Sequence, residues 1–376
     1  MKPRPPKSTE VSEGAKDAQD STGPLERVHL DELEAMNDAL AQRLAEGWAK
    51  IEADDAAGAR KLAEALVAEA DEAGEDAPEA LTLLGAAAAA DGDGEQAIAY
   101  YESALAIDPD YFEPQLLLAE TLLDASDDLD TALEHADLAL DLAEEEDEVL
   151  DAMLLKAEVL VAMGEDADAR ELLGDLPPIA LPDAEHHMRA GRLYADLEDF
   201  ADAQRHFELA VKLAPDSAEA YHGLGVVADL TGRDAERKAA WRKVRELDLA
   251  AATPRWHLSE ARVRELAGEA LDELPEAARA RLGNVPVQVW DYPSLQQIDD
   301  GMDPRLLGVF DGVALGDQSA VGGAPSLAHI FLFQRNIERV ARTEDEVQDE
   351  VRITVLHETA HFFGLGEAEL EALGLD

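Results

Sequence analysis

The stretch from Pro78 to Tyr111 reads PEALTLLGAAAAADGDGEQAIAYYESALAIDPDY, two apolar segments separated by the turn residues DGDG. Its small, aromatic and proline positions are Gly85, Ala97, Tyr101, Ala104 and Pro109. The same offsets return in residues 184–217 as Gly191, Ala203, Phe207, Ala210 and Pro215. Small residues let two antiparallel helices approach closely, an aromatic side chain fills the remaining gap, and a proline starts the next unit. The stretch therefore predicts a helical hairpin that repeats along the chain.

Weaker copies of this unit lie between and around the two strong ones. They are marked by Gly47 and Ala59, by Ala119, Ala132 and Ala139, by Ala157 and Ala169, and by Gly225 and Trp241. The period and the pattern of small and aromatic residues resemble the tetratricopeptide repeat. The resemblance implies a right-handed superhelix over residues 28–250 with a face that holds peptides or protein surfaces. A scaffold or an oligomerisation arm is the alternative, and the mostly acidic helices offer no basic clamp for a C-terminal carboxylate.

Length and composition set the outer limits. The 376 residues are enough for two domains and a sizeable core. Hydrophobic residues make up 47% of the chain and aromatic residues only 5%, which favours helices over a β-sandwich. Cysteine is absent, so a metal site must use histidine and carboxylate ligands.

The chain is strongly acidic. Its formal net charge is −53, from 84 acidic and 31 basic residues, which argues against binding to nucleic acid or to an anionic membrane. Such acidity serves solubility, for instance in a salty cytoplasm, and it leaves cations and basic partners as candidates. Residues 1–27 are rich in Pro, Ser, Lys, Glu and Gly and predict a disordered tail. This tail does not resemble a signal peptide, so we expect a cytoplasmic protein.

The pattern changes after Leu249, and residues 251–254 read as a linker to a second domain over residues 255–376. We expect helices over 259–274, 276–282, 336–342 and 344–363, and strands over 285–290, 306–313 and 329–333. The stretch over residues 306–313 predicts a hairpin that pivots near Asp311-Gly312, and residues 314–328, which are rich in Gly and Ser, predict a mobile loop before the third strand. The strand over 330–333 is a candidate for pairing with an extended substrate.

The last of these helices carries HETAH at residues 357–361. Residues four apart lie on one face of a helix, so the two histidines can hold one metal ion. Glu358 lies about 100° away in helical phase, where a general base that activates water belongs. Catalytic zinc needs three protein ligands and an open position. Gly364 lets the chain turn back towards the metal, which makes Glu367 the best candidate for the third ligand.

The succession of VPVQV, LLGVFDG, IFLF and VLHETAHFFGLGEAEL within residues 258–376 resembles the small zincin-like metallopeptidases of bacteria, often called minimal zincins. The resemblance implies a three- or four-stranded sheet beside the motif helix. It also implies zinc on His357 and His361, a carboxylate just downstream as third ligand, and Glu358 as the base. Glu367 is favoured for the third position, with Glu369 as its rival. The expected fold is mostly α, a repeat solenoid followed by a small α+β domain.

Three further histidines were candidates for a role. His186 and His187 are adjacent, so a helix points them in different directions, and we expect surface residues rather than a metal pair. His329 begins a strand, and we expect a structural residue there, with a role in stabilising an oxyanion as the alternative.

Two functions remain open at this point. One is a zinc metallopeptidase whose helical repeats recruit a protein or peptide substrate. The other is a non-catalytic adaptor, in which the repeats bind a protein partner and the second domain is a metal-stabilised module.

Overall fold

The computed structural model describes most of the chain beyond the first 38 residues. It covers residues 39–125, 128–174, 176, 181, 183–254, 256–282, 285–312, 329–341 and 343–365. The chain divides into two compact units, Met1–Pro182 and Asp183–Asp376. The tail expected at residues 1–27 lies outside the described residues.

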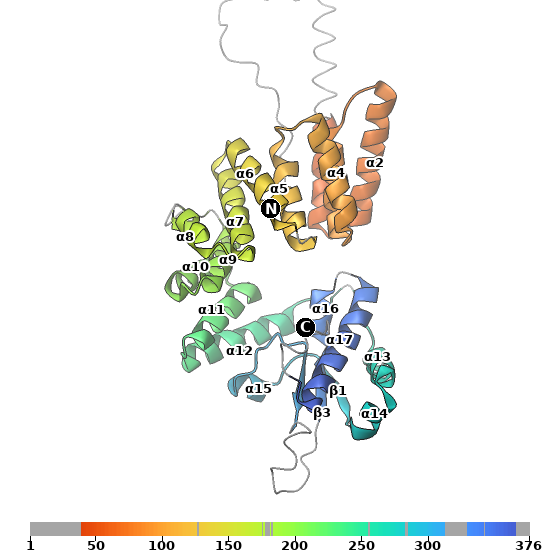
Figure 1. The fold of residues 1–376 in the computed structure, drawn as a ribbon, viewed down its shortest axis with the longest axis vertical. Coiled ribbons are helices and arrows are strands. Elements are labelled where there is room, and N and C mark those ends of the chain that lie inside the picture. Colours follow the sequence, from red (N-terminus) through yellow and green to blue (C-terminus); the bar gives the residue numbers. More distant parts are fainter. Residues whose placement is uncertain are drawn as a thin grey trace, which may run out of the picture. The chain divides into compact units, whose positions relative to one another are not determined.

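The first unit is a row of helices in which each helix packs against the next (Figure 1). After a helical segment over residues 39–52, its helices are α2 (Ala56–Ala73), α3 (Pro78–Ala90), α4 (Gly94–Ile107), α5 (Phe112–Ala125), α6 (Leu129–Leu142), α7 (Glu146–Ala162) and α8 (Asp166–Gly174). Asp55, Asp93 and Asp128 each accept a hydrogen bond from the backbone N–H three residues on. These aspartates cap α2, α4 and α6, so local sequence sets where the helices begin.

A glycine facing an aromatic ring marks the hairpins. The pairs are Gly85 with Tyr101, Gly191 with Phe207 and Gly225 with Trp241. A Cβ atom added to Gly85 would lie 2.4 Å from the Tyr101 ring, and one added to Gly225 would lie 2.0 Å from the Trp241 ring. Only glycine leaves room for the ring at this distance between two helices. The packing explains the small and aromatic positions of the repeat, including the weaker copy at Gly225.

The second unit begins with four more repeat helices and continues with a small α+β region. Its helices and strands are α9 (Ala184–Asp196), α10 (Phe200–Leu213), α11 (Ala218–Leu230), α12 (Asp234–Ala250), α13 (Glu260–Glu273), α14 (Glu276–Leu282), β1 (Val287–Trp290), α15 (Leu295–Asp299), β2 (Gly308–Asp311), β3 (His329–Phe333), α16 (Gln334–Val340) and α17 (Glu344–Phe363). The architecture is therefore mostly helical, a repeat array followed by an α+β region. The repeat helices α9 to α12 belong to the same compact unit as that region, and the division between residues 28–250 and 255–376 stays a prediction.

Three strands form a mixed sheet in the order β1-β3-β2. β1 and β3 are parallel, with Val287 opposite Ile330, and β2 and β3 are antiparallel, with Gly308 opposite Leu332. The expected pairing of a substrate with the strand over residues 330–333 is wrong, because β3 is the middle strand and both of its edges are occupied. β2 ends at Asp311 and pairs with β3 in antiparallel orientation. The residues after the hairpin turn expected near Asp311-Gly312, and the loop expected at 314–328, lie outside the described residues.

The core of the α+β region lies between the sheet, α13 and α17. Its buried residues are Leu258, Val263, Leu266, Ala267, Ala270, Val289, Ile330, Leu332, Ile337, Val347, Val351 and Val355. The three valines of α17 lie four residues apart, so one face of this helix packs on the sheet and on α13 (Figure 1). The HETAH motif lies in the C-terminal part of α17, directly after these valines. The packing of the valines in the core therefore holds the motif in place.

The two adjacent histidines of α9 are not surface residues. His186 is 8% exposed and His187 is 3% exposed, so the expectation from the sequence is wrong. His187 Nδ1 lies 3.1 Å from Nδ1 of the buried His206 in α10. His187 thus lies where α9 meets its hairpin partner α10, which the repeat period in the sequence does not reveal.

None of the helices in the described part of the chain is long and apolar enough to cross a membrane.

Candidate metal centre

The helix that carries the motif has a well-defined beginning and end. Thr343 accepts a hydrogen bond from the Glu346 N–H at 3.1 Å and caps the first turn. Gly364 has φ of 82°, a left-handed conformation that costs glycine little, and its N–H donates to the last turn of the helix. The helix spans Glu344–Phe363, as the sequence predicts, and it stops one residue before this turn. The second motif histidine thus lies in the last turn.

The two motif histidines face each other. His357 Nε2 and His361 Nε2 are 3.0 Å apart, and the ring centroids are 4.7 Å apart at an interplanar angle of 78°. Two nitrogens bound to one tetrahedral zinc at about 2.0–2.1 Å would be roughly 3.3 Å apart. The observed separation is close to this value, so the two side chains fit a zinc ion as a pair of Nε2 ligands.

The turn after the helix also orients one of the rings. His361 Nδ1 lies 3.3 Å from the carbonyl oxygen of Leu365. An Nδ1–H that donates to this carbonyl leaves Nε2 with its lone pair directed at a metal, which is the usual arrangement of a histidine ligand. The left-handed residue Gly364 brings the carbonyl back over the last turn.

The glutamate of the motif is buried against the edge strand. Glu358 is 7% exposed, and its Oε2 accepts a hydrogen bond from the Phe310 N–H at 2.6 Å. Phe310 lies opposite Ile330 in the register of β2 and β3, and Ile330 donates its own N–H to Pro286, on the β1 side. The two residues therefore form a non-hydrogen-bonded antiparallel pair, and the Phe310 N–H points away from β3. Glu358 is anchored to the outer edge of β2.

A glycine in β2 makes this contact between helix and strand sterically feasible. A Cβ atom on Gly308 would lie 2.6 Å from Thr354 Cγ2 and 3.1 Å from Glu358 Cγ. Gly308 is two residues before Phe310, so both residues face the same side of the strand. The Phe310 ring on this side packs edge-on against Phe362 of α17, with centroids 5.7 Å apart.

The candidates for a third ligand follow the motif helix in the sequence. Glu367 and its rival Glu369 both lie outside the described residues. Within the described ranges, no group of three or more histidine, aspartate or glutamate side chains is arranged to hold a metal ion. His329 begins β3 opposite Asp311 and stacks on Phe331 at 6.0 Å, and its role as an oxyanion group stays a hypothesis.

Sequence reasoning found the histidine pair but not the surroundings of the base. The Phe310 amide is invisible in a motif, because any residue supplies a backbone N–H. The signal for Gly308 was present, since a glycine inside a strand often marks the close approach of another element.

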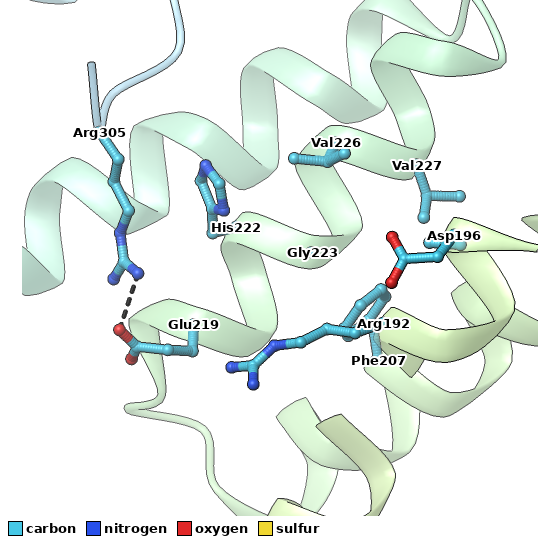
Figure 2. A pocket seen from close by; sticks show the side chains of 10 residues that line it. Arg192, Asp196, Phe207, Glu219, His222, Gly223, Val226, Val227 and Arg305 are labelled. Carbon is cyan, nitrogen blue, oxygen red and sulfur yellow. Dashed lines mark hydrogen bonds and ion pairs between the residues drawn. The ribbon is translucent and has the colours of Figure 1, made fainter. Parts of the chain in front are cut away.

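A pocket lies among the repeat helices of the same unit. Figure 2 shows it lined by side chains of α9, α10 and α11, with Arg305 from the segment before β2 at one side. Its lining includes the apolar side chains of Phe207 and Val227 and the charged side chains of Arg192 and Asp196. Its cavity volume is about 180 Å³, the scale of an engineered cavity of about 150 Å³ that holds a benzene molecule. The pocket suits a single side chain or a small group.

Helical hairpins packed through glycine–aromatic pairs, followed by an α+β module with HExxH on its last described helix, define a repeat protein with a zincin-like module. Sequence-family models agree. A tetratricopeptide repeat model matches residues 78–111 and 184–217, and a Zincin-like metallopeptidase model matches residues 282–375. The chain thus carries tetratricopeptide repeats and, at residues 282–375, a Zincin-like metallopeptidase domain.

Solved structures of repeat proteins are similar to the chain over about half of its length. A tetratricopeptide protein of Thermus thermophilus is 24% identical, with a TM-score of 0.40, and the match covers 46% of this chain and 91% of that one. YrrB, described as having an unusual peptide-binding site, is 19% identical, with a TM-score of 0.37 and coverage of 49% and 93%. A repeat protein of Parabacteroides merdae is 14% identical, with a TM-score of 0.42 and coverage of 64% and 96%. Among curated protein sequences, none matches this chain significantly.

Proposed function

We propose that this chain is a cytoplasmic, zinc-dependent metallopeptidase whose helical repeats recruit a protein substrate. The observation that carries the proposal is the facing pair of His357 and His361, with Glu358 buried beside them, on a domain that matches zincin-like metallopeptidases. Glu367 is the proposed third ligand, and Glu369 is the alternative.

The residues of the chain have distinct roles in this proposal. Zinc, when bound, would polarise a peptide carbonyl and make water acidic enough to be deprotonated near neutral pH. Glu358 takes the proton from water and later passes it to the leaving amine. The Phe310 N–H holds one oxygen of this carboxylate in place at 2.6 Å. The Leu365 carbonyl fixes the ring of His361.

The substrate would bind in an extended conformation along the outer edge of β2. In the described residues this edge has no neighbouring strand, and it runs beside Glu358. An extended peptide can add to such an edge through main-chain groups other than the Phe310 N–H, which Glu358 already occupies, and this suits an enzyme that cleaves the main chain. This assignment replaces β3, whose edges are both occupied.

The test combines metal content with a comparison of variants. Purified chain should bind about one zinc ion per molecule and cleave unfolded protein substrates. Glu358→Gln should keep the metal and lose activity by about 100-fold or more, because a positioned general base contributes at least that factor. Asp349→Asn is the matched control, since Asp349 is an exposed carboxylate on the same helix. His361→Ala should lose the zinc.

An inert wild-type chain would refute the proposal, provided that zinc is bound at one per chain and a broad substrate panel has been tried. The adaptor is then favoured, and the observation behind it is the share of the chain occupied by tetratricopeptide repeats. Partners captured by the full-length Glu358→Gln variant, and never cleaved by the wild type, would identify the chain as an adaptor.

A further inference from the structure

We propose that the last repeat helices, α11 and α12, position Glu358 by anchoring the segment that leads into β2. The catalytic consequence rests on the proposed peptidase function, whereas the anchoring itself does not. The contacts join residues of the repeat helices to residues of the α+β region, across the boundary that the sequence predicts at residues 250–255.

Two contacts tie α11 to the segment before β2. His222 Nε2 lies 2.9 Å from each carboxylate oxygen of Asp303. Arg305 Nη1 donates to Glu219 Oε1 at 2.7 Å, a contact that Figure 2 shows across the pocket. Asp303 also accepts the backbone N–H of Arg305 at 2.8 Å, so the two contacts act on one rigid turn.

A third contact comes from the last turn of α12. Asp248 has a side chain only 8% exposed, and it accepts hydrogen bonds from Arg339 at 2.9 Å and from Arg305 at 3.4 Å. Its backbone carbonyl accepts the Tyr292 hydroxyl at 3.0 Å. A carboxylate this deeply buried is costly unless its partners are held in a fixed geometry. The C-terminal end of α12 is therefore built into the α+β region.

The distance from this anchor to the base is short along the chain. Arg305 is three residues before Gly308, where β2 begins, and five residues before Phe310. The Phe310 N–H donates to Glu358, and Gly308 lies directly beneath its side chain. Among the described strands, β2 is paired only with β3. A loosened leading segment would therefore let β2 move away from α17. Asp303 and Arg305 thus act as positioning residues for Glu358.

The same segment is also held from α16. Asn336 is fully buried, and its Nδ2 donates to the carbonyl oxygens of Pro304 and Leu306 at 2.8 and 2.7 Å. If the contacts of Asn336 alone held the segment, the repeat helices would have no effect on the position of β2. An experiment on α11 therefore decides between the two arrangements.

The decisive variant is the double substitution Glu219→Gln with His222→Ala in the full chain. Both changes lie on α11, so any effect on β2 must pass through Asp303 and Arg305. The control is Arg242→Gln, which removes a bidentate contact from α12 to Asp299 but leaves the turn before β2 intact. Hydrogen–deuterium exchange is measured in peptides covering β2 and β1, and circular dichroism verifies that each variant is folded.

Exchange in β2 is expected to accelerate about tenfold or more in the double variant, the factor that the loss of one charge-assisted hydrogen bond implies. Exchange in β1 should stay as in the wild type, and the control should match the wild type in both strands. Unchanged exchange in β2, or equal acceleration in β1 and β2, would overturn the proposal.

Activity gives a second, separable readout. In an active enzyme the double variant should lower kcat, because the base is displaced, and raise KM, because β2 is also the edge along which the substrate is proposed to bind. An unchanged kcat would contradict the positioning role. A wild type without peptidase activity would refute the proposed function, and the exchange comparison would still decide whether α11 anchors β2.

Discussion

Gly308→Ala is the sharpest test of how the edge strand meets the motif helix. The new methyl group would lie 2.6 Å from Thr354 Cγ2 and 3.1 Å from both Glu358 Cγ and the carbonyl oxygen of Phe331. The first distance is well inside van der Waals contact, and the last involves backbone that cannot turn aside. Gly308 does not have a positive φ, so its backbone conformation suits alanine. The cost is therefore packing rather than backbone strain.

The magnitude follows from two opposing contributions. Overpacking a filled site costs about 1–3 kcal/mol. Replacing glycine with alanine in extended backbone returns roughly 0.5–1 kcal/mol, because the unfolded chain has fewer conformations to lose. The net destabilisation should be about 1–2 kcal/mol. For a compact unit of this size, that corresponds to a fall in Tm of about 2–8 °C.

The assay is thermal and urea unfolding of the full chain, wild type against Gly308→Ala, with Thr354→Ser introduced into both backgrounds. Serine lacks the Cγ2 methyl group that meets the added Cβ, so it should recover most of the stability that the alanine costs. An alanine variant as stable as the wild type would refute the reasoning. So would a loss of stability that Thr354→Ser does not reduce, since the two positions would then be independent.

Three further predictions concern the repeats. Asp248→Asn should lower the free energy of unfolding by about 2–3 kcal/mol in a urea titration, because it leaves two partly exposed arginines without their buried carboxylate. Burial, and secondarily His187, lowers the pKa of His206 to about 4. As the pH falls from about 6.5 towards 4, His206 therefore takes up a proton in the unfolded state but not in the folded state. The wild type should lose about 1–2 kcal/mol of unfolding free energy between pH 7.5 and pH 5, and His206→Gln should abolish this loss. Gly225→Ala should lower Tm, measured by circular dichroism, because its Cβ would lie 2.0 Å from the Trp241 ring.

Most of the helices were predictable because their signals are local. Ser259 caps α13 by accepting the Arg262 N–H, and Leu274 before Pro275 ends it, as expected. The motif helix has the predicted bounds because a threonine cap and a left-handed glycine lie at its two ends. The repeat hairpins were predictable from glycine and aromatic positions sixteen residues apart, which meet across two helices.

Contacts between distant parts of the chain were not predictable. The middle position of β3 depends on pairing with two strands, β1 and β2, that both precede the 17 residues 312–328, and no periodicity encodes the order of strands. The short helix α15 was missed because its Ser294–Gln297 capping box was not recognised. The burial of His187 depends on His206, which lies in the other helix of its hairpin.

The candidate site likewise has one part that the sequence predicts and one part that only the fold reveals. Helical phase alone places His357 and His361 on one face, and the structure brings their Nε2 atoms to 3.0 Å. The same phase places Glu358 beside them but says nothing of its hydrogen-bond partner. That partner is the Phe310 amide, 48 residues earlier in the chain, and only the fold brings it there.

The contacts of α12 also bear on the kind of substrate. A repeat array that only carried a peptidase could be joined to it by the four residues 251–254 as a flexible linker. Instead Asp248, three residues before that stretch, is buried under Arg305 and Arg339 from the α+β region. Such contacts fix the direction of the last repeat with respect to the β2 edge inside one compact unit. If the chain is the proposed peptidase, a protein held on α9 to α11 would present one particular segment to Glu358, which favours cleavage of a specific protein over general digestion.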